Sequence, residues 1–146
     1  MSHVKSKCRT LSTNIWNAQW KNTREYRQTK IFFPELNISH SRHLIRLEQE
    51  TFGRAIRWIT GHCFLNRLNN LLYPADFPNP KCRLCNFHTE TSSHIICECE
   101  ELSIIRYHHF QNLILPLEPI PIIKQLTSYL NDPRIHNLET LPHDQN

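Results

Sequence analysis

Three cysteines and one histidine lie within residues 82–99, and their spacing is typical of a metal-binding site. Cys82 and Cys85 form a Cys-x2-Cys pair, and His94 and Cys99 form a His-x4-Cys pair. A Cys-x2-Cys turn directs two thiolates toward one ion, and the second pair can complete a tetrahedral zinc site. Three thiolates and a neutral imidazole leave no position open for water. The spacing therefore predicts a structural zinc ion rather than a catalytic one.

Other residues of the same segment are alternative ligands. Cys97 lies three residues after His94 and would share its face on a continuous helix, whereas Cys99 requires the helix to loosen. The spacing favours Cys99, with Cys97 as its substitute. His88 is a weaker alternative to His94, because it lies close to Cys85 in the chain. The six cysteines are an even number, but the metal-like spacing and the lack of a secretory signal argue against disulfides.

The size and composition of the chain favour one small helical domain. A chain of 146 residues can bury roughly two thirds of its unfolded surface. The nine prolines outnumber the two glycines, which suits helices separated by prolines better than a sheet with tight turns. No apolar run approaches the roughly 18 residues of a membrane span. We therefore expect no membrane partner and an intracellular protein, nuclear or cytoplasmic, in which thiols stay reduced.

The basic residues are concentrated in the first part of the chain. Residues 1–81 contain 13 Lys or Arg against five Asp or Glu, whereas residues 82–146 contain four against eight. The first part is thus the candidate surface for RNA or DNA, although an ordinary solvated surface explains its composition equally well. The candidate phosphate contacts lie on its predicted helices and beside the first cysteine: Lys21, Arg24, Arg27, Arg42, Arg46, Arg54, Arg57, Lys81 and Arg83.

The elements that position the cysteines are predicted to be mainly α-helical, with little or no sheet, around a CCHC zinc knuckle. Residues 1–12 are expected to be unstructured, and Ile31, Phe32 and Phe33 to form a short extended run. Five parts follow from the pattern: a basic N-terminal segment with a short helix (1–33), a helical hairpin (34–74), the zinc knuckle (75–101), C-terminal helices (102–131) and a loose tail (132–146).

The hairpin is predicted from caps and stop signals. Ser39 or Ser41 can cap a first helix that ends at Gly61, and a second helix is expected at about 62–73. Gly53 should cost the first helix about 1 kcal/mol relative to alanine, unless a neighbour packs closely against it.

The elements after the hairpin are predicted in the same way. Residues 74–80 form a proline-rich linker, and Thr91 or Ser92 can cap a short helix that carries His94 to the metal. One helix is expected at 100–114. Another is expected at 121–131, where Asp132-Pro133 would end it.

The motifs between Thr60 and Cys99 also resemble a known family. Thr60-Gly61-His62, the Cys-x2-Cys pair, Glu90-Thr91 and the His-x4-Cys pair occur in the order that follows the ribonuclease H domain in non-LTR retrotransposon polyproteins. The resemblance extends from about Leu11 to Leu130. Cys63 and Asn86 stand where that family usually has glycine. Asparagine tolerates a left-handed turn, so the second departure is mild.

The resemblance implies a zinc-binding and nucleic-acid-binding accessory module for parent-type reverse transcriptase and ribonuclease H domains. Two-metal hydrolysis needs several converging carboxylates, and this chain has only three aspartates, Asp76, Asp132 and Asp144. We therefore expect no enzymatic activity. The alternative is a zinc-stapled protein–protein interaction module, which the acidic second part and the apolar segment 113–126 would favour.

Overall fold

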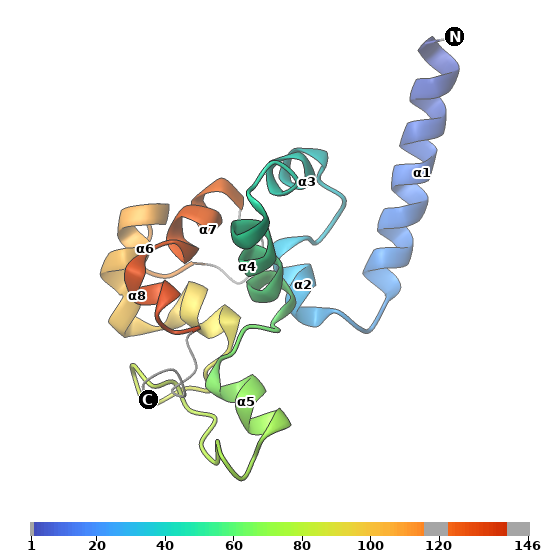
Figure 1. The fold of residues 1–146 in the computed structure, drawn as a ribbon. Coiled ribbons are helices and arrows are strands. Elements are labelled where there is room, and N and C mark those ends of the chain that lie inside the picture. The colour runs from blue at the N-terminus through green and yellow to red at the C-terminus, as the bar shows by residue number, and fades with distance from the viewer. Residues whose placement is uncertain (1, 116–122, 140–146) are drawn as a thin grey trace.

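The computed structural model describes residues 2–115 and 123–139, and these residues form a mainly α-helical protein (Figure 1). Within them the pairing of Lys81 with Thr89 is an isolated β-bridge and no sheet forms. The predicted fold class is therefore confirmed as mainly α. The helices are α1 Ser2–Asn22, α2 Arg27–Phe32, α3 Ile38–Leu44, α4 Gln49–Thr60, α5 Asn66–Leu72, the π-helix η1 His94–Glu98, the 3-10 helix η2 Glu100–Leu102, α6 Ser103–Phe110, α7 Ile123–Leu130 and α8 Pro133–His136.

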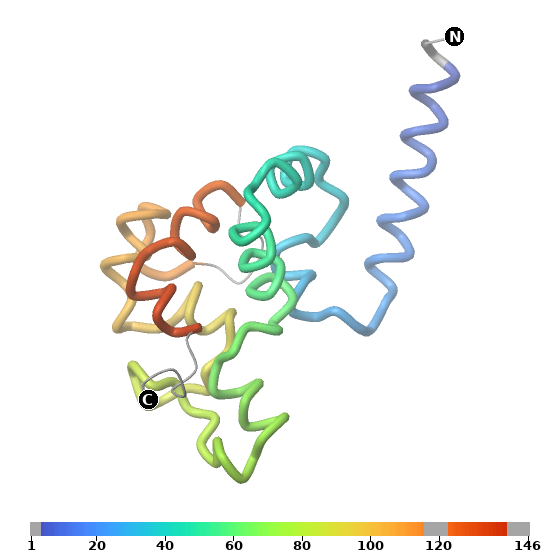
Figure 2. Tube along the Cα trace, in the orientation of Figure 1, coloured from blue at the N-terminus to red at the C-terminus, as the bar shows by residue number. Residues whose placement is uncertain are grey.

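The core lies where α7 meets its neighbours. This helix contacts α3, α4, α6 and α8, and α2 packs on the other side of α4. Trp58 of α4, Ile95 of η1 and Leu126 of α7 are fully buried among these helices. The tube view shows that α5 and the loop after it lie at one end of this body (Figure 2). The metal-binding segment thus connects that end to the core.

The N-terminal part is more helical than predicted. Residues 2–12, expected to be unstructured, belong to the 21-residue helix α1. Ile31 and Phe32 of the expected extended run end α2, which buries Phe32, and Phe33 is its C-cap. The sequence of α1 contains neither proline nor glycine, so nothing interrupts a helix there. Where α1 ends, Trp20 Nε1 donates to the Phe33 carbonyl at 2.7 Å, and Asn17 Oδ1 accepts from the Leu36 amide at 2.9 Å.

The first helix of the predicted hairpin is divided in two. Its cap is Asn37, whose Oδ1 accepts from the His40 amide at 3.0 Å, rather than Ser39 or Ser41. After α3 the chain turns tightly at residues 45–48 before α4 begins, and Ile45 in this turn is 73% exposed. The stop at Gly61 is confirmed, since this residue adopts a left-handed φ of 77°.

The later helices are shorter than predicted. Helix α5 covers only part of 62–73, and the linker 74–80 contains no helix, as expected. The helix expected at 100–114 is instead η2 followed by α6, which ends at Phe110 because Gln111 after it adopts a left-handed φ of 59°. Of the helix expected at 121–131, residues 121 and 122 lie outside the described part of the chain.

The predicted loose tail begins with structure. Asp132 caps α8 by accepting from the Arg134 amide at 3.0 Å, with Pro133 in the first turn. An Asp-Pro pair can therefore end one helix and start the next. Ile135 and Leu138 are buried against the core, so the prediction of a loose tail is wrong for residues 132–139. No helix among the described residues has the length and apolar character needed to span a membrane.

The two glycines of the chain should respond oppositely to alanine. A Cβ at Gly53 would meet only Arg57 Nη1 at an ordinary 3.6 Å, so Gly53→Ala should raise the free energy of unfolding by about 1 kcal/mol. At Gly61 a Cβ would lie 3.2 Å from Gln28 Cγ on a left-handed backbone, so Gly61→Ala should lower it by about 1–2 kcal/mol. Urea unfolding of both variants measures the two signs, and equal signs would contradict this assignment.

Candidate metal centre

The structure brings the four favoured ligands together at one point. Each of Cys82, Cys85, His94 and Cys99 offers a donor atom, and these atoms all lie within 4.8 Å of one another. The Sγ atoms of Cys82 and Cys99 are 3.9 Å apart, and Cys85 Sγ is 3.4 Å from His94 Nε2. With usual zinc bond lengths, the matching edges of a tetrahedron are about 3.8 Å and about 3.6 Å. The group can therefore hold one metal ion.

Local backbone geometry explains how the first two cysteines meet. The Asn86 amide donates to the Cys82 carbonyl at 2.8 Å, and the Cys82 amide donates to the His88 carbonyl at 2.7 Å. Asn86 completes this knuckle with a left-handed φ of 57°, as its tolerance for that conformation predicted. All six cysteines of the chain are free thiols, so the disulfide alternative is not what the structure contains.

A π-helical turn explains how Cys99 reaches the group. Residues His94–Glu98 form η1, and the Cys99 amide donates to the His94 carbonyl five residues back at 2.8 Å. This wider turn is the loosening that Cys99 required. Cys97 is fully buried outside the group, and burial raises its pKa to about 12. It is therefore a protonated, apolar thiol at neutral pH.

Two side chains from the C-terminal helices support the π turn. The carbonyl of Ile95 accepts from the Tyr129 hydroxyl at 2.8 Å, and the carbonyl of Ile96 accepts from Arg106 Nε at 2.8 Å. Arg106 Nη2 also donates to the Cys99 carbonyl at 2.6 Å. Burial raises the pKa of Tyr129, so this residue remains a hydroxyl donor. Hydrogen bonds from α6 and α7 thus stabilise the backbone between His94 and Cys99, which lies outside these two helices.

The imidazole of His94 has a carboxylate on its other side. Nε2 faces Cys85, whereas Nδ1 lies 3.5 Å from Glu98 Oε2. Such carboxylates commonly orient metal-binding imidazoles. Thr91 Oγ1 accepts from the His94 amide at 3.0 Å, in agreement with the predicted cap. The exposed His88 ring lies near the His94 ring, with centroids 5.3 Å apart and the planes tilted by 44°, but its nitrogens do not belong to the donor group.

The thiols of Cys82 and Cys99 share a proton. Their hydrogen bond lowers the pKa of Cys82 to about 5 and raises that of Cys99. A bound cation must displace the shared proton before the second sulfur becomes a thiolate ligand, so metal binding releases protons.

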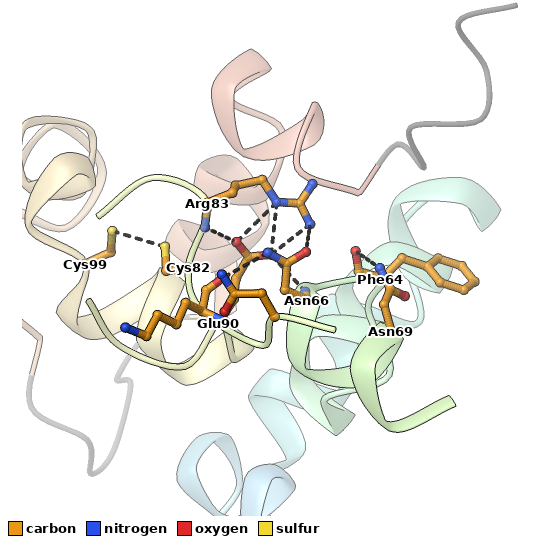
Figure 3. A network of polar contacts seen from close by, with 9 residues as sticks. Phe64, Asn66, Asn69, Cys82, Arg83, Glu90 and Cys99 are labelled. Carbon is orange, nitrogen blue, oxygen red and sulfur yellow. Dashed lines mark hydrogen bonds and ion pairs between the residues drawn. The ribbon is translucent and has the colours of Figure 1, made fainter. Parts of the chain in front are cut away.

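A buried carboxylate joins the knuckle to α5 (Figure 3). Glu90 is fully buried and accepts from Arg83 Nη2 at 2.8 Å, from the Arg83 amide at 2.7 Å and from the Asn66 amide at 2.9 Å. Glu90 appeared in the sequence only as part of a family-like motif, and its structural role was not predicted. Its position between Cys85 and His94, inside the metal-binding segment, was the one feature of the sequence that could have indicated a structural role. Arg83 therefore has an intramolecular partner next to the ligands.

The other predicted phosphate contacts divide into exposed and engaged groups. Arg54 is only 8% exposed and bonds to Asn131 Oδ1 at 2.9 Å, while Arg54 and Arg57 both lie near the Glu139 carboxylate. Arg54 is thus removed from the candidate contacts, because it is buried in intramolecular pairs. Six candidates are exposed: Lys21, Arg24, Arg27, Arg42, Arg46 and Lys81.

Comparison with known proteins adds no family to these observations. No protein-family model matches the chain, and neither the curated proteins nor the solved structures contain a match. The resemblance to the retrotransposon region therefore stays a prediction from the motifs.

Substitution of the two neighbouring cysteines distinguishes ligand from core residue. Cys99→Ala should lower metal affinity at least a hundredfold, because one of four donors is lost. Cys97→Ala removes a buried thiol outside the donor group and should retain one equivalent of metal. Metal analysis of the purified variants, with competition by a chelator, measures the difference. Loss of metal in the Cys97 variant alone would contradict the assignment.

Removing the charge of Glu90 should weaken both fold and site. Glu90→Gln leaves the Arg83 guanidinium without its buried anion and should lower the free energy of unfolding by about 3 kcal/mol. Glu25→Gln is the matched control, since Glu25 is exposed and such changes usually stay within about 0.5 kcal/mol. Thermal and urea unfolding of the metal-loaded proteins measures both changes. Equal stability of the two variants would refute a supporting role for Glu90.

Proposed function

We propose that this chain is a zinc-binding and nucleic-acid-binding accessory module of the retrotransposon type. The observation that carries the proposal is the group of three sulfurs and one imidazole nitrogen at metal-ligand spacing. Sulfur-rich tetrahedral donor sets favour zinc over hard cations such as magnesium and calcium. All four zinc positions would be filled by protein, so the ion would be structural.

The ion would join two segments that otherwise have separate attachments, the knuckle to α5 through Glu90 and the π turn to α6 and α7. Cys82 and Cys85 belong to the knuckle, whereas His94 begins the π turn that leads into the core and Cys99 follows it. Zinc bound by all four would fix the knuckle to the helical body. This is the usual way in which a small domain with a modest core gains stability from metal.

Exposed cations support nucleic acid as the partner. Arg24 and Arg27 flank the start of α2, Arg42 and Arg46 lie on and just after α3, and Lys81 precedes the first ligand. Each is exposed and can approach a phosphate without breaking the intramolecular pairs described above. Arginine and lysine contacts to phosphate provide affinity without base specificity. The partner is therefore RNA or DNA recognised mainly through its backbone.

Within a parent polyprotein, the module would position the element RNA or the target DNA. The catalytic domains would be the reverse transcriptase and ribonuclease H, and this chain would contribute no catalytic group. The metal site supports that view, because a fully protein-coordinated ion has no position for substrate or water.

A second candidate function is a zinc-stapled protein-docking module. Apolar side chains on and after α6 are exposed and favour it: Ile104 is 80%, Tyr107 52% and Ile114 70% exposed. Docking through such residues would tolerate salt, whereas phosphate contacts would not. Salt dependence therefore separates the two candidates.

The test measures binding of the zinc-loaded chain to fluorescent single-stranded RNA and duplex DNA across a salt series. Each phosphate contact to a single strand contributes about −0.7 to the slope of log K against log salt. Arg24→Gln with Arg27→Gln should reduce the magnitude of that slope by about 1.4 and weaken binding. Lys124→Gln with Arg134→Gln removes the same charge from exposed positions of the second part and should have a smaller effect. Absence of binding at low salt, or equal effects of both pairs, would reject nucleic acid as the partner.

A further inference from the structure

Helix α1 presents an apolar stripe that no other part of the described chain covers. The stripe residues Val4, Cys8, Leu11, Ile15 and Ala18 follow the 4-3 spacing of a heptad repeat, and the polar Asn22 occupies the next position of that repeat. At 100° per residue they fall within an arc of about 80°. All six are exposed, with Val4 at 67%, Leu11 at 62% and Ile15 at 51%. Two of the largest exposed aliphatic side chains of the helix thus lie one turn apart on one narrow face.

The opposite face of α1 is already used to attach the helix. Trp16 stacks on Trp20 with centroids 5.4 Å apart, Trp20 stacks on Tyr26, and Asn17 binds the Leu36 amide. These contacts involve only the last part of α1. In Figure 1 the rest of the helix extends away from the body. The stripe cannot turn toward the core without breaking the attachment, so its partner lies outside this chain's core.

The shape of the stripe favours a helix as the partner. Apolar residues confined to the a and d positions of a heptad form the narrow seam of a coiled coil, whereas a helix lying on a membrane needs a wider apolar face. Large aromatic residues usually anchor membrane-surface helices. In α1 these residues, Trp16 and Trp20, lie on the side that attaches the helix to the body.

The charges beside the stripe indicate which charge the partner helix should have. With Cys8 and Ile15 at a positions, Lys5 occupies an e position, and Lys7 and Lys21 occupy g positions. Residues Ser2–Asn22 include Arg9 as a further cation and no aspartate or glutamate. Two copies of such a helix would repel one another. A helix with glutamate at its e and g positions would pair favourably at both flanks.

We propose that α1 is a docking helix that forms a short two-stranded coiled coil with an acidic amphipathic helix of a partner protein. The inference is independent of the metal site, and it shares only Lys21 with the candidate phosphate contacts. Helices in proteins gain most of their stability from packing of an apolar face rather than from intrinsic propensity, so docking would also stabilise α1 itself.

The experiment uses the full zinc-loaded chain and two designed three-heptad peptides. Both peptides have isoleucine at a and leucine at d, and they differ in having glutamate or lysine at e and g. The acidic peptide should bind at least tenfold more tightly than the basic one in isothermal titration at low salt. Equal affinities for the two peptides, or no binding of either, would overturn the proposal.

Matched variants test whether the stripe is the contact. Leu11→Asp with Ile15→Asp should weaken binding of the acidic peptide at least tenfold. Ser6→Asp with Thr10→Asp adds the same charge on another face of α1 and should change the affinity by no more than about threefold. Circular dichroism checks that both variants keep their helix content. Equal losses, or sedimentation of the free chain as a dimer that only the stripe variant dissociates, would contradict docking to an acidic helix.

Discussion

The structure depends on bringing sulfur atoms that are distant in the chain into one small volume. Cys82 and Cys99 lie at opposite ends of the segment, yet their Sγ atoms are 3.9 Å apart in a buried position. A hydrogen bond joins the two sulfurs, and the proton lies between them. A divalent cation replaces that proton, converts both sulfurs to ligands and adds the donors of the neighbouring knuckle and imidazole. The cation would therefore supply the energy that fixes the knuckle to the helical body.

The metal group and the hydrophobic core stabilise each other through the π turn. A turn of this kind is less favourable than α-helix and is often found at functional sites. Here its carbonyls are satisfied by Tyr129 and Arg106, which come from helices packed in the core. Arg106 is completely buried, so its guanidinium needs hydrogen-bond acceptors. The carbonyls of Ile96 and Cys99 provide them, and the guanidinium in turn satisfies those carbonyls. Substitution of the ligands would thus destabilise α6 and α7, and a loss of core packing would displace Cys99.

The sequence predicted well those features that depend on neighbours in the chain. The spacing of Cys82 and Cys99 relative to the other ligands identified the residues that meet, and the stop at Gly61 followed from one residue's backbone preference. Features that depend on tertiary contacts were missed. Arginine is usually a surface residue, so the sequence gives no sign that Arg106 is buried. Its burial depends on the backbone carbonyls that accept its hydrogen bonds. The break between α3 and α4 and the docking of Ile135 likewise depend on how α7 packs.

X-ray absorption at the zinc edge of the purified full chain tests the central claim most directly. The account predicts one zinc per chain, with three sulfur neighbours at about 2.3 Å and one nitrogen neighbour at about 2.0 Å. A spectrum with only nitrogen and oxygen neighbours, or a folded protein that contains no metal, would contradict it.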